Sequence, residues 1–163
     1  MPEFGYNLAK QLGDALLRRG WRVTCAESCT GGGVSSAITA VAGSSQWFDG
    51  GVVTYSNRVK SGLLGVPDTM LETNGAVSEA TVCAMAEGVL ELMNTDVAVA
   101  VSGIAGPDGG TQGKPVGTVW FAWCSKNSRH AECRHFIGDR QRVRQQAVEV
   151  ALSVLLEMVT SSS

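Results

Sequence analysis

The chain has no apolar run long enough to cross a membrane. Charge or glycine interrupts its apolar stretches well before the ~18 residues that a transmembrane helix needs. Residues 1–3 also lack the basic segment, followed by an apolar one, that opens a secretory signal. Of the 163 residues, 44% are hydrophobic and 17% are charged, which is ordinary for a globular protein. We therefore predict one cytoplasmic domain over residues 1–163, with no membrane partner.

The chain also lacks an excess of basic residues and a C-x-x-C cysteine motif. A formal net charge of −2 leaves no broad basic face, so we predict no nucleic-acid partner. Arg140, Arg142 and Arg144 form a local cationic cluster that suits a small anion better than a polymer. The five cysteines are odd in number and include no C-x-x-C pair. This pattern predicts reduced thiols and no structural zinc.

Helical and strand patterns alternate along the chain. Apolar runs predict strands over residues 21–26, 50–55, 97–101, 116–124 and 131–137. Helical spacing or capping residues predict helices over residues 1–20, 34–42 and 57–64, and two more that begin at Ser78 and Asp139. Only residues 125–129 join the last two strands, too few for a crossover helix, so those strands form a hairpin. The sequence predicts an α/β domain with a mixed sheet.

Three of the predicted strands lead into a hydroxyl-bearing residue beside a turn. Ser28 follows the first strand, Tyr55 ends the second, and Ser102 follows the third. If the strands are parallel, these residues meet at the carboxyl edge of the sheet, where α/β folds bind ligands. The sequence therefore predicts one site assembled from three distant segments.

The turn after Ser28 contains Thr30, Gly31 and Gly32 and opens a predicted helix. A helix amino terminus after a glycine turn presents free N–H groups and a positive dipole, which favour a phosphate or an oxyanion. Ser28 is then a candidate nucleophile. The alternative is that Ser28 or Thr30 only caps the helix, and spacing alone favours that alternative. The segment matches neither G-x-G-x-x-G nor G-x-S-x-G.

A nucleophilic serine needs a base. The two histidines, His130 and His135, lie in a predicted hairpin turn and on a late strand, so a Ser-His-Asp triad is disfavoured. Lys60 lies near the predicted sheet edge, five residues after Tyr55, and Ser-Lys pairs are a recognised alternative. Its amine must lose a proton, which burial or neighbouring cations promote. The alternative is an ordinary solvated lysine.

Residues 102–117 are rich in glycine and superficially resemble a P-loop. Asp108 replaces the first glycine of G-x-x-x-x-G-K-[ST], and Pro115 replaces its hydroxyl residue, so the pattern fails. A backbone wrapped around a ligand and a simple tight turn both remain open.

Arg140 and Arg144 lie four residues apart in the first two turns of the last predicted helix, where positive charge opposes the helix dipole. This placement predicts a bound anion. The alternative is a salt bridge to Asp139 or Glu149.

Five segments that contain these residues resemble the CinA C-terminal domain family, whose characterised members are nicotinamide-mononucleotide deamidases. The segments are Ala26–Gly32, Val53–Asn57 with Lys60, Ser102–Gly110, Lys114–Trp120, and Gly138–Arg140 with Val143 and Arg144. The resemblance runs from about Leu8 to Leu156 and is closest to the stand-alone form, since larger members carry a further amino-terminal domain.

The resemblance implies a three-layer α/β/α sandwich similar to anticodon-binding domains. Its mixed sheet of five strands would have the order 2-1-3-4-5, with strand 4 antiparallel. It also implies hydrolysis of the carboxamide of nicotinamide mononucleotide to nicotinic acid mononucleotide and ammonia, in pyridine-nucleotide salvage. No cofactor or metal is implied, and homo-oligomerisation is left open.

The resemblance implies a nucleophilic Ser28 with Tyr55 and Lys60 as activating partners. The residues expected to bind substrate are Thr30, Gly31, Gly32, Asn57, Ser102, Gly103, Gly106, Lys114, Arg140 and Arg144. The oxyanion is expected on N–H groups around Thr30 and Gly31 or in the loop after Ser102. Two alternatives remain: a non-catalytic nucleotide-binding paralogue, and an amidohydrolase for another phosphorylated amide.

Overall fold

The computed structural model describes residues 5–161. The domain predicted over residues 1–163 thus includes six terminal residues outside this range. The helices are α1 (Tyr6–Arg19), α2 (Gly33–Thr39), the 3-10 helix η1 (Ser44–Gln46), α3 (Asn57–Leu64), α4 (Asp68–Asn74), α5 (Glu79–Met93) and α6 (Arg140–Ser161). The strands are β1 (Val23–Glu27), β2 (Val52–Val53), β3 (Val97–Gly103), β4 (Thr118–Ser125) and β5 (Arg129–His135).

The strands form one five-stranded sheet in the order β2-β1-β3-β4-β5. β1 pairs in parallel with β2 and with β3. β4 pairs antiparallel with β3 and with β5. The order and the antiparallel fourth strand confirm the predicted topology, and the carboxyl ends of β1, β2 and β3 meet at one edge.

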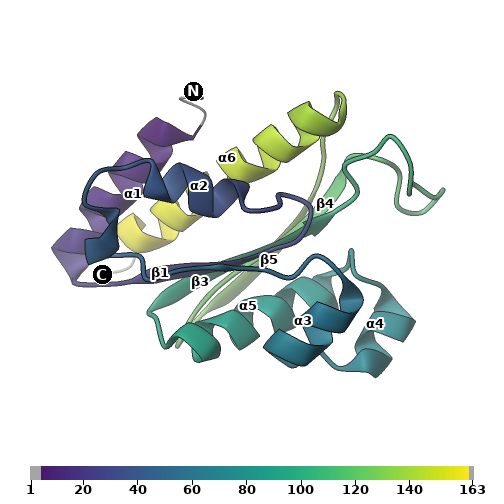
Figure 1. The fold of residues 1–163 in the computed structure, drawn as a ribbon, viewed down its shortest axis with the longest axis horizontal. Helices are drawn as coiled ribbons and strands as arrows, with labels where there is room; N and C mark the ends of the chain where they lie inside the picture. The colour runs from purple at the N-terminus through teal and green to yellow at the C-terminus, as the bar shows by residue number, and fades with distance from the viewer. Residues whose placement is uncertain (1–4, 162–163) are drawn as a thin grey trace.

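Helices cover both faces of the sheet, so the protein has three layers. Figure 1 shows α1, α2 and α6 on one face and α3, α4 and α5 on the other. Within β3, Val97, Val99 and Val101 belong to the core on the first face, while Ala98 and Ala100 belong to the core on the second. The period-2 alternation of strand side chains accounts for this division. Because helices cover both faces of the sheet, residues 97–101 of β3 are all apolar.

The second face is packed closely where α3 crosses α5. Gly88 of α5 lies against the end of α3, and a Cβ at Gly88 would stand 2.3 Å from the Leu64 carbonyl oxygen. The missing side chain lets α5 come close to α3, which carries Lys60. The sequence did not predict α4 or η1, whose seven and three residues are short for a periodic signal.

Most predicted caps are present. Ser78 Oγ accepts a hydrogen bond from the Thr81 amide and starts α5, and Asp139 Oδ1 accepts one from the Arg142 amide and starts α6. Asn57 was expected to cap the helix predicted over residues 57–64, but the cap is the preceding residue, because Ser56 Oγ accepts the hydrogen bond from the Val59 amide. His130 lies in β5 and not in the hairpin turn, because β5 already begins at Arg129.

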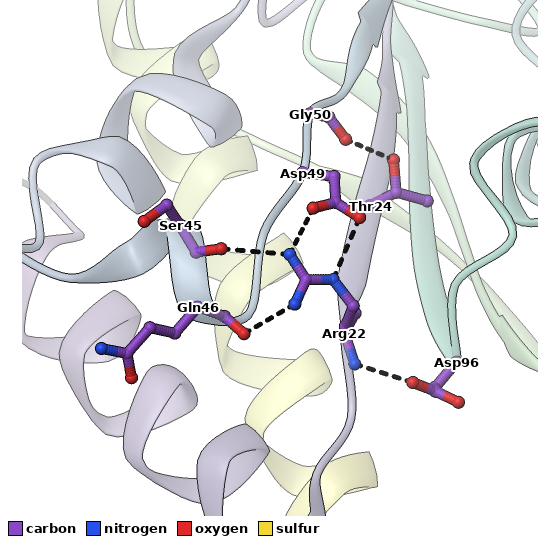
Figure 2. Close-up of polar contacts among 7 residues, drawn as sticks. All are labelled: Arg22, Thr24, Ser45, Gln46, Asp49, Gly50 and Asp96. Atoms are coloured by element: carbon purple, nitrogen blue, oxygen red, sulfur yellow. Dashed lines mark hydrogen bonds and ion pairs between the residues drawn. The ribbon is translucent and has the colours of Figure 1, made fainter.

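A polar cluster fixes the amino end of β1, opposite the Ser28 edge (Figure 2). The Arg22 guanidinium donates to the Ser45 and Gln46 carbonyl oxygens at 3.0 and 2.8 Å and pairs with the Asp49 carboxylate. The Arg22 amide donates to Asp96 Oδ2 at 2.8 Å. These contacts tie β1 to η1 and to the turn before β3.

All five cysteines are unpaired, as predicted, and only Cys133 is more than slightly exposed. No helix within residues 5–161 combines the length and the apolar character needed to cross a membrane.

Candidate active site

The structure brings Ser28, Tyr55 and Lys60 together from three different elements. Ser28 follows β1, Tyr55 follows β2, and Lys60 lies in the second turn of α3. Lys60 Nζ donates to Ser28 Oγ at 3.0 Å and to the Tyr55 carbonyl oxygen at 2.9 Å. Ser28 Oγ also donates to the Tyr55 carbonyl oxygen at 3.3 Å. A serine hydroxyl, a lysine amine and a main-chain carbonyl therefore form a closed triangle.

The side chain of Lys60 is enclosed by protein. The residue is 1% exposed, although it lies in the amphipathic helix α3 between the half-buried neighbours Val59 and Ser61. Burial lowers the pKa of the Lys60 amine below its usual value of 10.5, because a low-dielectric surrounding penalises the charged form. This burial excludes the solvated-lysine alternative.

The turn after Ser28 is organised around the buried carboxylate of Glu27. Glu27 Oε1 accepts hydrogen bonds from the Thr30 hydroxyl and from the Gly32 and Val34 amides at 2.6 to 3.1 Å. Glu27 Oε2 accepts bonds from the amide and hydroxyl of Ser35 at 2.9 and 2.8 Å. The protein thus places its own anion at the amino terminus of α2.

This finding changes the predicted anion site. Two of the N–H groups expected to be free are occupied, because the Gly32 amide donates to Glu27 and the Gly31 amide donates to the Ser28 carbonyl oxygen at 3.0 Å. Thr30 Oγ1 is likewise bonded to Glu27. Neither Ser28 nor Thr30 caps α2 with its side chain, which also removes the simple capping alternative.

Arg144 fixes the same turn from α6. Its Nε donates to the Cys29 carbonyl oxygen at 3.0 Å, and its Nη2 donates to the Thr30 carbonyl oxygen at 3.2 Å. The salt bridge considered with Glu149 is not among the ion pairs of residues 5–161. Arg144 therefore binds main-chain oxygens of the serine turn.

A cavity of about 250 Å³ opens over Ser28 and Lys60. Tyr55, Ser102 and Arg140 supply its other polar side chains, and Gly103 and Cys29 also line it. Two of the lining residues within residues 5–161, Lys60 and Arg140, are basic, and none is a carboxylate. The cavity is therefore suited to a small ligand that carries negative charge.

Ser102 lies beside Ser28 on the adjacent strand. Glu27 pairs with Val101 in β1 and β3, so Ser28 and Ser102 are one position further on and share a sheet face. Ser102 is 1% exposed and lines the cavity, yet its hydroxyl has no hydrogen-bond partner in the described part of the chain. The Ser102 hydroxyl is therefore available to a ligand in the cavity.

Arg140 reaches the mouth of the cavity from the start of α6. Its Nη1 donates to the Gly106 carbonyl oxygen at 2.7 Å, and its Nη2 donates to the Tyr55 phenol oxygen at 3.4 Å. Arg140 thus joins the glycine-rich loop to Tyr55 on the opposite side of the opening.

Lys114 and Asn57 lie outside the cavity. Lys114 Nζ donates to the Asn74 carbonyl oxygen at 2.9 Å and so ties the glycine-rich loop to the end of α4. Asn57 is the exposed first residue of α3. Neither side chain is among those that line the cavity.

Cys29 is next to Ser28 but is a poor nucleophile in this site. Burial raises the pKa of its thiol to about 12, so the reactive thiolate is scarce at neutral pH.

Sequence reasoning missed Glu27. Its signal was a carboxylate at the last position of an otherwise uncharged strand, directly before a glycine turn. A charge at a fully buried strand position requires partners, and the N–H groups of the turn were the available ones.

Comparisons with known proteins agree with the fold and with these segments. Residues 5–159 match the family model described as the CinA C-terminal domain. The chain is 55% identical to a "Nicotinamide-nucleotide amidohydrolase PncC" of Enterobacter agglomerans over 93% of each chain. It is 52% identical to the protein of that name in Escherichia coli K12, over 91% of this chain and 90% of the relative.

A solved structure has the same fold. The competence damage-inducible protein A of Klebsiella pneumoniae MGH 78578 superposes with a TM-score of 0.94 at 43% identity, over 97% of this chain and 98% of that one. The chain belongs to the CinA C-terminal domain family.

Proposed function

We propose that the protein hydrolyses the carboxamide of nicotinamide mononucleotide to the carboxylate and ammonia. The observation that carries this proposal is the contact of 3.0 Å between Ser28 Oγ and the buried Lys60 amine. A module that only binds a nucleotide needs no lysine buried against a serine hydroxyl. The names of the relatives at 52% and 55% identity support the same substrate.

The reaction proceeds through an acyl-enzyme. Ser28 Oγ attacks the carboxamide carbon while its proton passes to neutral Lys60 Nζ, and the carbonyl oxygen becomes an oxyanion. The Tyr55 carbonyl oxygen accepts an N–H of the resulting ammonium and keeps it in place. Lys60 then returns the proton to the leaving nitrogen, and ammonia departs.

Water completes the turnover. Lys60 takes a proton from the water that attacks the Ser28 ester, and that proton returns to Ser28 Oγ as the carboxylate leaves. Lys60 thus acts as base and acid in turn, so the lowered pKa of its amine suits both steps.

Two further residues bind the substrate in this scheme. The Ser102 hydroxyl lies on the same sheet face as Ser28 and donates to the oxyanion, a role for which the bonded amides of Gly31 and Gly32 are not available. Arg140 at the cavity mouth binds the phosphate. Arg140 lines the cavity and Arg144 does not, so we assign the phosphate to Arg140 alone.

Ammonia release from purified protein tests the proposal. Nicotinamide mononucleotide should react much faster than its riboside or free nicotinamide, because the remote phosphate positions the carboxamide. Ser28→Ala should abolish turnover, whereas the matched Cys29→Ser variant should keep it. Absence of ammonia with wild-type protein would favour a non-catalytic binding module. We propose the cytoplasm as the location of the protein for either function.

Arg140→Gln separates phosphate recognition from chemistry. It should remove most of the preference for the mononucleotide and leave slow riboside turnover almost unchanged. An equal loss with both substrates would show that Arg140 supports the fold or the chemistry and that the phosphate binds elsewhere.

A further inference from the structure

We infer that the aromatic ring of Tyr55 is the specificity element of this site and binds the positively charged pyridinium ring of the substrate. The inference rests on the proposed function, since it concerns the substrate of the same cavity. It assigns Tyr55 two separate roles: its main-chain carbonyl oxygen accepts a hydrogen bond from the Lys60 amine, and its side chain selects the ligand.

The position of the phenol supports this division. Ser28 and Lys60 both contact the Tyr55 main-chain oxygen, whereas the phenol oxygen contacts Arg140 Nη2 at 3.4 Å. The phenol hydroxyl therefore lies at the mouth and not in the Ser28–Lys60 contact. A proton passing from Ser28 to Lys60 has a direct path of 3.0 Å and needs no relay.

No carboxylate among the described cavity-lining residues could balance the positive charge of a pyridinium ring. The lining residues include Lys60 and Arg140 but no carboxylate. A nicotinamide ring joined to ribose through its nitrogen carries a full positive charge. Within residues 5–161, the only aromatic side chain that lines the cavity is Tyr55, whose π face is negative and attracts cations.

The side chain of Tyr55 is exposed beside the cavity, where a bound ligand can cover its ring. The residue is 61% exposed beside the cavity, while Trp47 and Trp123 are buried in the core. A ring seated on Tyr55 would have its carboxamide directed to the buried Ser28 and its ribose phosphate directed outward past Arg140. This class of ligand is an N-substituted pyridinium carboxamide with an anionic tail.

Paired ligands isolate the ring charge. Nicotinamide mononucleotide and its reduced form share the carboxamide, ribose and phosphate, but the reduced ring is neutral. Binding to Ser28→Ala protein, which prevents turnover, is measured by calorimetry for both. We expect the charged form to bind roughly 3- to 30-fold more tightly, the size of a cation–π contact.

Variants of Tyr55 in the Ser28→Ala background locate the source of that preference. Tyr55→Leu should abolish it, and Tyr55→Phe should restore it, because phenylalanine keeps the π face and loses only the hydroxyl. Tyr6→Leu, the same change at a tyrosine that lines a different cavity, should leave the preference intact.

The proposal is overturned if Tyr55→Leu keeps the preference, if Tyr55→Phe loses it, or if the Ser28→Ala protein binds the two forms equally or not at all. The proposed function fails on a different result, namely the absence of ammonia from wild-type protein. A protein that prefers the charged ligand but releases no ammonia would keep the Tyr55 inference and refute the amidase.

Discussion

Two buried charges of opposite sign flank Ser28, and their surroundings differ sharply. Glu27, on the α2 side, is fully buried and accepts five hydrogen bonds from the N–H and O–H groups of Thr30, Gly32, Val34 and Ser35. Lys60, on the α3 side, is equally enclosed, but within the described part of the chain its amine donates to only two oxygen atoms, both neutral.

The difference separates a structural charge from a reactive one. The Glu27 carboxylate organises the turn that carries Ser28, and every donor around it would lose a partner without it. Burial lowers the pKa of the Lys60 amine, and no carboxylate among residues 5–161 forms an ion pair that would offset this effect, so the neutral amine that accepts a proton is easier to form. Removing each charge should therefore harm a different property.

The largest effect is expected for Lys60→Met. Methionine keeps an unbranched chain of similar length but has no basic nitrogen, so kcat should fall about 10²- to 10⁴-fold. Stability should not fall, because a poorly compensated buried amine is removed. Steady-state kinetics and urea denaturation of the same preparation check both parts.

Lys10→Met on the exposed face of α1 is the matched control and should change neither quantity. A Lys60→Met protein with nearly normal kcat would refute the role of Lys60 as base.

Glu27→Gln should show the opposite pattern. Glutamine keeps the shape but turns one acceptor oxygen into a donor that faces the existing donors, so stability should fall by about 3 kcal/mol. The loss is read from urea unfolding. The exposed Glu72→Gln in α4 should stay within about 0.5 kcal/mol of wild type. A stability of Glu27→Gln equal to that of this control would show that the Glu27 hydrogen bonds do not hold the turn.

The strands and the terminal hairpin could be predicted from the sequence pattern, and the strand order was implied by the resemblance to the family, whereas the hydrogen-bond partners within the site could not be predicted. Period-2 runs and short loops identify strands, and the Val97–Val101 run indicated burial on both faces. The juxtaposition of Ser28, Tyr55 and Lys60 followed from strand ends meeting at one edge. The sequence pattern does not show which donor binds which acceptor, because hydrogen-bond partners depend on side-chain geometry in three dimensions.

Arg144 and Glu27 illustrate the limit. Both Arg140 and Arg144 matched an anion-binding pattern, yet only Arg140 faces the cavity, because Arg144 reaches the Cys29 and Thr30 carbonyl oxygens. The helix amino terminus matched an anion site as well, and the anion there is Glu27 of the chain itself.

The pH dependence should sharpen the assignment of Lys60. The rate should rise with pH, by about tenfold per unit below the lowered pKa of Lys60, since the neutral amine is the base. Between that pKa and 10.5 the unfolded chain binds more protons at this residue than the folded protein does, so stability should also rise with pH.

Buried thiols contribute in the opposite direction. Burial raises the pKa of Cys29 and of Cys124 to about 12, so their stabilising effect is lost as pH rises through that value. Both wild type and Lys60→Met contain these thiols, so the contributions of the thiols cancel when the stability of one protein is subtracted from that of the other. A difference that does not change with pH would show that the Lys60 amine has an ordinary pKa.

The smallest effect concerns two buried threonines that lie on neighbouring strand segments. Thr54, next to Tyr55, has a buried hydroxyl without a hydrogen-bond partner in the described residues. Thr24 of β1 is equally buried, and its hydroxyl donates to the Gly50 carbonyl oxygen at 2.7 Å. Because valine is close to threonine in shape, Thr54→Val should stabilise the protein by about 1 kcal/mol, and Thr24→Val should destabilise it by about as much. Urea unfolding of the two variants under one set of conditions measures the contrast in sign. If Thr54→Val instead costs stability, its hydroxyl has a partner in solution, and a water bound between the ends of β1 and β2 would be the first to seek.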